Sequence, residues 1–245
     1  LSEIRGSSVD RAKQVLNAAL DLGINFLDTS TCYGDSEYLV GEAVGARRGE
    51  YFLATKAGHS TDDYLGPEWT GPTVTAAIDR SLRLLKTDVL DLVQLHSCGV
   101  DILERGEVIE ALKAAREAGK TRFIGYSGDN EAAHWAVDSG IFDTLQTSFN
   151  LVEQTARTSD LLAKASSGNM GVIAKRPTAN AVWGVARREG RAGEVTGYGA
   201  EYFRRALEIV DIGGIEGEPD DPIKTSLGFT FAHPEISVAI VGTSN

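Results

Sequence analysis

Four side chains with distinct proton chemistry follow three strand-like segments in the first part of the chain. Asp28 ends the first segment, and Tyr33 lies in the loop after it. Lys56 ends the second segment and His96 ends the third. Each has a structural alternative, as a turn cap, a loop anchor, a solvated strand end or a hydrogen-bonded rim residue. Together they favour a catalytic site, because barrels of alternating strands and helices carry their catalytic groups at the C-terminal strand ends.

The four groups suit protonation of a carbonyl oxygen. A tyrosine hydroxyl has an ordinary pKa of about 10, and a nearby lysine ammonium lowers that pKa by favouring the phenolate. We predict that Tyr33 is the general acid and that Lys56 tunes its pKa. Asp28 is predicted to orient Lys56, and His96 to donate a hydrogen bond to the substrate oxygen. This set fits a reaction in which hydride reaches the carbonyl carbon.

Strand-like and helical periodicities alternate along the chain and would position these groups. We count seven strand-like segments, at residues 25–29, 51–56, 89–96, 121–127, 142–149, 171–177 and 236–241. Segment 89–96 is nearly all apolar before its end, which is typical of a strand buried on both faces of a parallel sheet. Strict alternation indicates an α/β fold, either a barrel or a doubly wound sheet. No GxGxxG pattern follows the first segment, so we predict a (β/α)8 barrel of the TIM type.

Amphipathic helical segments fill the intervals between the strands. They are predicted after Ser8 as far as Gly23 and at residues 36–44, 72–85, 108–118 and 222–232. Residues 178–222, rich in glycine and charge, are predicted to be a partly helical insertion with a helix at 202–210. A closed barrel of this type has eight strands. We therefore expect a single barrel domain over residues 1–245 that lacks the first strand and the terminal helix, and is thus truncated at both ends.

Composition argues against several classes of partner. A net charge of −11 disfavours nucleic acid and anionic membrane surfaces. No apolar run approaches the roughly 20 residues that a membrane helix needs. The two cysteines, Cys32 and Cys98, and the four scattered histidines show neither a disulfide framework nor a zinc-ligand spacing. We expect a cytoplasmic protein without a resident metal whose partner is a small molecule.

The segments around the four groups resemble the aldo-keto reductases. They read Asn-Phe-Leu-Asp-Thr at 25–29, Tyr-Gly-Asp-Ser-Glu at 33–37, Ala-Thr-Lys at 54–56 and Asp-Leu-Val-Gln-Leu-His at 91–96. The resemblance covers nearly the whole chain in the right order. It implies an (α/β)8 barrel with an Asp-Tyr-Lys-His tetrad that binds NADPH, or alternatively NADH, without a Rossmann domain. The implied activity is an NAD(P)-dependent reduction of aldehydes or ketones to alcohols.

The resemblance also implies a set of cofactor-binding residues. Ser127 and Gln146 match family positions that hold the carboxamide, although Gly128 stands where the family has asparagine. Lys175 and Arg176 replace an aromatic segment, so we expect Arg176 to stack on the nicotinamide or both residues to contact the pyrophosphate. Residues 242–244 match a segment that receives phosphate near a helix N-terminus. The predicted set is Asp28, Ser127, Gln146, Lys175, Arg176, Gly242, Thr243 and Ser244.

Other interpretations of the same residues stay open. A lyase would use Lys56 as a Schiff-base amine, and a non-catalytic relative would bind the cofactor without turnover. In the loop at 59–71, Tyr64 and Trp69 would either line an apolar pocket or pack the loop down. Cys98, two residues after His96, is a further candidate to face the site.

Overall fold

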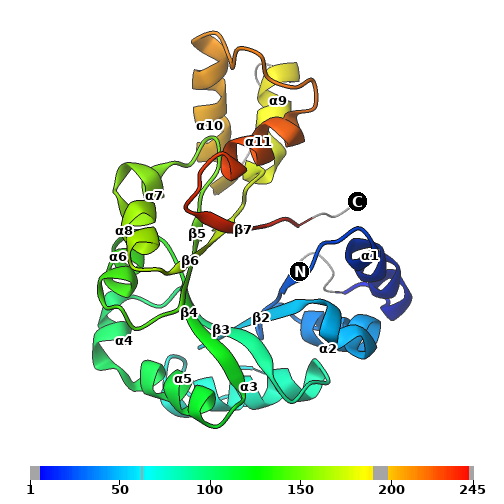
Figure 1. Ribbon diagram of the computed structural model, residues 1–245, viewed down its shortest axis with the longest axis vertical. Helices are drawn as coiled ribbons and strands as arrows, with labels where there is room; N and C mark the ends of the chain where they lie inside the picture. The colour runs from blue at the N-terminus through cyan, green and yellow to red at the C-terminus, as the bar shows by residue number, and fades with distance from the viewer. Residues whose placement is uncertain (1–5, 62, 190–197, 243–245) are drawn as a thin grey trace. The chain divides into compact units, whose positions relative to one another are not determined.

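The computed structural model describes residues 6–61, 63–189 and 198–242 (Figure 1). Contacts within the chain define two compact units. The first contains the described residues up to Leu145 together with Gly242, and the second is Gln146–Val241. The single barrel domain over residues 1–245 stays a prediction.

Parallel strands form the sheet of the first unit and are paired in chain order. They are β1 (Phe26–Asp28), β2 (Phe52–Ala57), β3 (Leu90–His96) and β4 (Thr121–Ser127). Their register sets Asp28 opposite Ala54 and His96 opposite Ser127. Strand β3 is buried over nearly its full length, as the apolar run at 89–96 predicted, and β2 is buried to a similar extent. Because all four strands are parallel, their C-terminal ends lie along one edge of the sheet.

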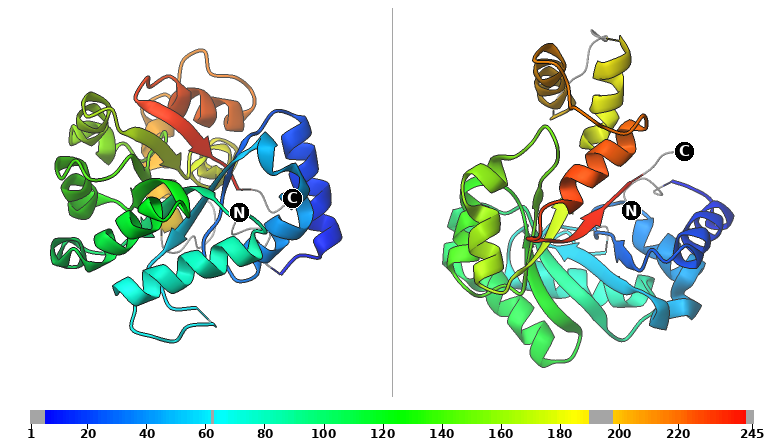
Figure 2. Two further views of the ribbon diagram at one scale, coloured as in Figure 1. Left: turned by 60° about the horizontal axis from the view of Figure 1, so that its bottom comes forward. Right: turned by 45° about the horizontal axis from the view of Figure 1, so that its top comes forward.

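Four helices of the first unit lie where the periodicity predicts them: α1 (Val9–Asp21), α2 (Ser36–Val44), α3 (Gly71–Leu84) and α5 (Glu107–Glu117). The unit also contains α4 (Val100–Arg105) and α6 (Asn130–Asp138). Ser8 caps α1 by accepting a hydrogen bond from the Arg11 N–H, and Thr70 caps α3 in the same way from the Thr73 N–H. Helix α1 packs against α2, and α3 against α5 (Figures 1 and 2). The short helix α4 and a 3-10 turn at Gly45–Glu50 were not predicted.

The second unit contains β6 (Gly171–Lys175) and β7 (Ile236–Ile240), which pair in parallel, while β5 (Thr144–Ser148) leads into it. Its helices are α7 (Thr155–Thr158), α8 (Leu161–Ser167), α9 (Val182–Glu189), α10 (Tyr198–Asp211) and α11 (Pro222–Phe231). The predicted insertion is more helical than expected, because α10 extends beyond 202–210 and α9 was not predicted. Helices α9 and α10 pack against each other, and Trp183, Tyr202, Phe203 and Ala206 are buried together in one apolar cluster.

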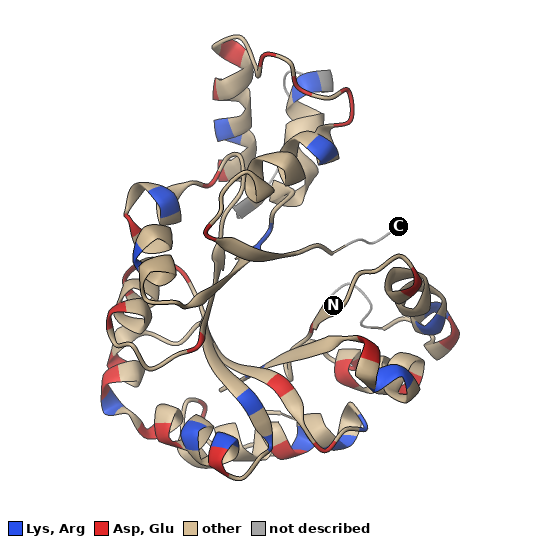
Figure 3. Cartoon of the chain, in the orientation of Figure 1, with Lys and Arg blue, Asp and Glu red and all other residues tan. Residues whose placement is uncertain are grey.

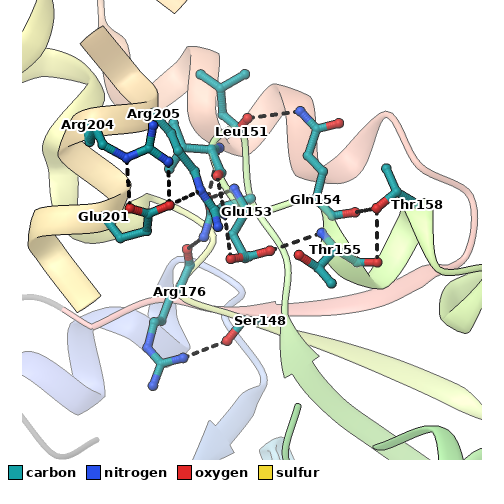
Figure 4. Close-up of polar contacts among 12 residues, drawn as sticks. Ser148, Leu151, Glu153, Gln154, Thr155, Thr158, Arg176, Glu201, Arg204 and Arg205 are labelled. Atoms are coloured by element: carbon teal, nitrogen blue, oxygen red, sulfur yellow. Dashed lines mark hydrogen bonds and ion pairs between the residues drawn. The ribbon is translucent and has the colours of Figure 1, made fainter. Parts of the chain in front are cut away.

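Arg205 ties α10 to the loop after β5. Its Nη1 donates to Glu153 Oε2 at 2.7 Å and to the Val152 carbonyl at 3.0 Å, while its Nε donates to Glu201 Oε1 at 2.8 Å (Figure 4). Charge-assisted hydrogen bonds of this kind are the stronger ones in proteins. The network therefore helps to hold the inserted helix in place.

Charged residues lie mostly on the helices and loops, and few lie on the strands (Figure 3). This distribution fits strands that are covered on their faces by helices.

Within the described ranges, no helix combines the length and the apolar character needed to cross a membrane.

Candidate active site

A buried ion pair joins the ends of β1 and β2. Lys56 Nζ lies 2.6 Å from Asp28 Oδ2 and also donates to the Thr29 carbonyl at 3.0 Å. The Lys56 side chain is 1% exposed and that of Asp28 is 5% exposed. A charge is costly to bury unless it is paired and hydrogen-bonded, so the carboxylate keeps the ammonium charged and fixes its position.

Tyr33 lies beside this pair, with Lys56 Nζ 5.2 Å from the centre of its ring. Burial raises the pKa of the Tyr33 hydroxyl above its ordinary value, Lys56 lowers it, and Asp28 raises it further. Lys56 thus acts in the predicted direction, but the burial of Tyr33 outweighs it and the net shift is upward. The hydroxyl is therefore protonated at neutral pH, which is the form that a general acid requires.

His96 completes the group of four. Its ring lies 5.7 Å from that of Tyr33, edge to face at 78°. Its Nδ1 is 3.1 Å from Ser30 Oγ and 3.3 Å from Cys32 Sγ. Ser30 and Cys32 were not predicted as site residues, although their place in the loop between Asp28 and Tyr33 is a signal that points to them.

A second imidazole lies next to His96. The His59 ring is 5.4 Å from the His96 ring and 4.8 Å from the Trp69 ring, edge to face in both cases. Gly58 has a φ of 129°, and a Cβ at this position would lie 2.0 Å from the Trp69 ring. Only glycine fits here. Of the two arrangements predicted for this loop, Trp69 adopts the one in which its ring packs the loop down, against Gly58 and His59.

Tyr64 and Cys98 are occupied elsewhere. The Tyr64 ring covers Gly66 within the loop. Cys98 is 3% exposed, and burial raises the pKa of its thiol to about 12. The Tyr126 hydroxyl donates to the Cys98 carbonyl at 2.6 Å. A buried thiol with a raised pKa is unreactive. The cysteine whose sulfur contacts His96 is Cys32.

The predicted cofactor residues fall in both units. In the first unit, Ser127 is buried at the end of β4, and its carbonyl accepts a hydrogen bond from Ser97 Oγ at 3.0 Å. Gly242 is exposed, while Thr243 and Ser244 lie outside the described residues. In the second unit, Gln146 is buried in β5 and Lys175 ends β6.

Arg176 follows β6 in the left-handed region, with a φ of 57°. Its Nη1 donates to Ser148 Oγ at 2.6 Å, and its carbonyl accepts from Asn150 Nδ2 at 2.9 Å (Figure 4). Non-glycine residues rarely adopt this conformation, which costs about 1–3 kcal/mol and persists where the surroundings enforce it. The two hydrogen bonds supply that constraint and fix the guanidinium beside Lys175.

Phe149, directly after β5, packs in the interior. It is fully buried, with its ring 5.5 Å from Phe229 and 4.8 Å from His233.

In the described part of the chain, no three His, Cys, Asp or Glu side chains are placed to hold a metal ion.

Comparisons with known proteins find one matching family and several relatives. The model of the aldo/keto reductase family matches residues 3–245. The uncharacterized oxidoreductase YqkF of Bacillus subtilis is 29% identical over 252 residues, which cover 98% of this chain and 80% of YqkF. The L-galactose dehydrogenase of Arabidopsis thaliana is 28% identical over 247 residues, covering 96% of this chain and 75% of that protein.

A solved structure shares the fold. The holo form of aldo-keto reductase AKR11C1 from Bacillus halodurans matches with a TM-score of 0.80 and 23% identity, over 99% of this chain and 80% of that one. This match confirms the fold class predicted from the sequence, the β/α barrel of the aldo-keto reductases.

Proposed function

Because the chain belongs to the aldo/keto reductase family and is an NAD(P)-dependent oxidoreductase, we propose that it reduces aldehydes or ketones to alcohols, with Tyr33 as general acid. The observation that carries the proposal is the position of Tyr33 beside the buried pair of Lys56 and Asp28, with Lys56 Nζ 5.2 Å from the centre of its ring. Proton donors of this kind accelerate carbonyl reduction because the oxygen gains negative charge as hydride arrives.

Each of the four groups has a separate task in this reaction. Tyr33 gives its proton to the carbonyl oxygen, and His96, with its ring 5.7 Å away, donates a hydrogen bond to the same oxygen. Lys56 stabilises the phenolate that Tyr33 becomes after the transfer. Asp28 keeps Lys56 charged and in place.

The polar and charged residues predicted to bind the cofactor suit a nicotinamide dinucleotide. Protein side chains move protons but do not carry hydride, which NADPH or NADH supplies when bound. Lys175 and the anchored Arg176 place two positive charges at the end of β6, which suits a pyrophosphate. The hydroxyl and amide groups of Ser127 and Gln146 suit a carboxamide, and residues 242–244 suit a phosphate. We propose NADPH as the cofactor and NADH as the alternative, since both have the pyrophosphate and the carboxamide that these residues suit.

Lyase chemistry at Lys56 is not favoured. A Schiff base forms from the neutral amine, whereas Lys56 is held as an ammonium by a carboxylate 2.6 Å away.

The Arabidopsis relative is an L-galactose dehydrogenase. We therefore propose that the substrates include hydroxylated carbonyl compounds beside simple aldehydes.

A titration with NADPH and then NADH, followed by nicotinamide fluorescence, tests the proposal. A panel of aldehydes is then added and the loss of reduced-cofactor absorbance is recorded for the wild type and for Tyr33→Phe. We expect both proteins to bind cofactor and only the wild type to consume it at an appreciable rate. Absence of binding to either cofactor would refute the reductase. Binding without turnover across the panel would instead indicate a non-catalytic relative.

A further inference from the structure

His59 is held in a defined orientation by Glu68. Its Nδ1 lies 3.1 Å from Glu68 Oε1, which also accepts a hydrogen bond from the Ser60 N–H at 3.3 Å. The backbone N–H of Trp69 donates to the Gly58 carbonyl at 2.8 Å, and this hydrogen bond closes the loop that contains His59 and Glu68. The imidazole is thus fixed by a carboxylate at one ring nitrogen and packed on Trp69 on one side.

The Glu68 contact decides which His59 nitrogen carries the hydrogen. An ionised carboxylate only accepts hydrogen bonds, so Nδ1 is the protonated nitrogen. In the neutral imidazole, Nε2 then carries a lone pair and accepts a hydrogen bond. His59 Nε2 makes no hydrogen bond within the described part of the chain, and 34% of the side chain is exposed. A ligand can therefore reach this acceptor.

One edge-to-face contact links His59 to His96, and another links His96 to Tyr33. The His59 ring lies 5.4 Å from the His96 ring, which lies 5.7 Å from the Tyr33 ring. In the proposed function, the reacting oxygen is bound by Tyr33 and His96. His59 contacts His96 directly, so its acceptor is close enough for a group on a carbon next to the carbonyl, and that group must donate a hydrogen.

We propose that His59 is a specificity-determining residue that accepts a hydrogen bond from a substrate hydroxyl close to the reacting carbonyl. The preferred substrates are then hydroxylated aldehydes or ketones, of the kind that sugars and small polyols provide. This inference rests on the proposed reductase function. Glu68 is a positioning residue that fixes the His59 tautomer.

Substrate pairs that differ by one hydroxyl test this inference. Glycolaldehyde is compared with acetaldehyde, and glyceraldehyde with propanal, with each rate expressed per free carbonyl form. We expect wild-type kcat/KM to favour the hydroxylated member by about tenfold or more, since a site that hydrogen-bonds a hydroxyl discriminates against its absence. His59→Phe keeps the ring but removes the acceptor, and this preference should fall at least fivefold.

Matched variants separate hydrogen bonding from loop packing. His59→Gln retains a polar acceptor and should keep part of the preference, and Glu68→Gln should give a preference between those of the wild type and His59→Phe. Tyr64→Phe, on the same loop, should leave the preference unchanged. An equal kcat/KM for both members of each pair in the wild type would overturn the inference. A wild type that turns over no aldehyde with either cofactor would refute the reductase function instead.

Discussion

Ser30 Oγ lies 3.1 Å from His96 Nδ1 and joins the loop after β1 to the end of β3, across 66 positions in the sequence. A neutral imidazole donates from one nitrogen and accepts at the other. If His96 donates from Nε2 to the substrate oxygen, Nδ1 must accept, and the Ser30 hydroxyl is a stronger donor than the neighbouring Cys32 thiol. Ser30 is thus the residue that is suited to set the His96 tautomer.

Replacement of this hydroxyl should slow the reaction without weakening cofactor binding. A typical hydrogen bond contributes about 1 kcal/mol, so Ser30→Ala should lower kcat roughly fivefold. Ser30→Thr keeps the hydroxyl and should retain most of the activity. Steady-state kinetics and a cofactor titration of both variants provide the measurement. Equal kcat values for Ser30→Ala and the wild type would show that the contact has no role in orienting His96.

The alkaline limb of the activity profile should report Tyr33. Reduction uses the protonated phenol, and burial raises the Tyr33 pKa above its ordinary value of about 10. We expect kcat/KM for reduction to stay flat on the alkaline side until the pH approaches this raised pKa, and to fall beyond it. Lys56 lowers the Tyr33 pKa, so Lys56→Met should move any residual alkaline limb to higher pH. A limb below pH 9 in the wild type would contradict the assignment of Tyr33.

The ion pair of Asp28 and Lys56 should have a measurable effect on the free energy of unfolding, because both charges are buried. Removal of one partner of a buried ion pair leaves an uncompensated charge and typically costs about 3–5 kcal/mol. Asp28→Asn should therefore lower the free energy of unfolding by about 3 kcal/mol. The double variant Asp28→Asn with Lys56→Met should recover part of that loss, because no unpaired charge remains. Urea unfolding of both single variants and the double variant gives the interaction energy.

Arg176 variants should distinguish pyrophosphate contact from stacking on the nicotinamide. Loss of a charged hydrogen bond costs about 1.5–3 kcal/mol, so Arg176→Ala should raise the Kd for NADPH roughly 10- to 100-fold. Arg176→Lys keeps the charge but loses the planar guanidinium. A Kd near that of the wild type in the lysine variant indicates pyrophosphate contact, and a Kd near that of the alanine variant indicates stacking. Ser148→Ala, which removes the anchor of the guanidinium at 2.6 Å, should have a smaller effect. An unchanged Kd in Arg176→Ala would exclude Arg176 from the cofactor site.

The strand ends were predictable from the sequence, because a short apolar run that stops at a titratable residue marks both the strand and its C-terminal end. Asp28, Lys56 and His96 were found in this way, and the structure brings them together with Tyr33. The contacts of Ser30 and Glu68 were not predictable, because the conformation of each loop decides which side chains meet. The upward pKa shift of Tyr33 also depends on burial, which the sequence of a loop does not reveal.

Helix α9 was missed for a related reason. Gly184 interrupts its pattern and lowers its helix propensity. In the structure, a Cβ at this position would lie 2.8 Å from Pro222 Cγ, so close packing favours glycine there. The apolar face of α9 is covered by α10, a partner that lies outside the segment itself.

Glu37 should make stability depend on pH in a direction opposite to that of most carboxylates. It is fully buried on α2, and its carboxylate accepts hydrogen bonds from Thr55 Oγ1 and Ser81 Oγ at 2.6 Å each, with Arg80 Nη1 at 2.9 Å. Burial outweighs these contacts and raises the Glu37 pKa above that of an unfolded chain. The folded state therefore binds more protons than the unfolded state between the two pKa values.

Stability from Glu37 is thus fully present below the unfolded pKa, near 4.3, and is lost as the pH rises through the raised folded pKa. Glu37→Gln removes this titration and leaves Arg80 without its closest carboxylate, which should cost about 1–3 kcal/mol at neutral pH. Urea unfolding of both proteins from pH 4 to pH 8 gives the difference in free energy. We expect the wild type's advantage over Glu37→Gln to grow as the pH falls through this window. If that advantage shrinks instead, the folded carboxylate has a lowered pKa and the contacts with Arg80, Thr55 and Ser81 outweigh its burial.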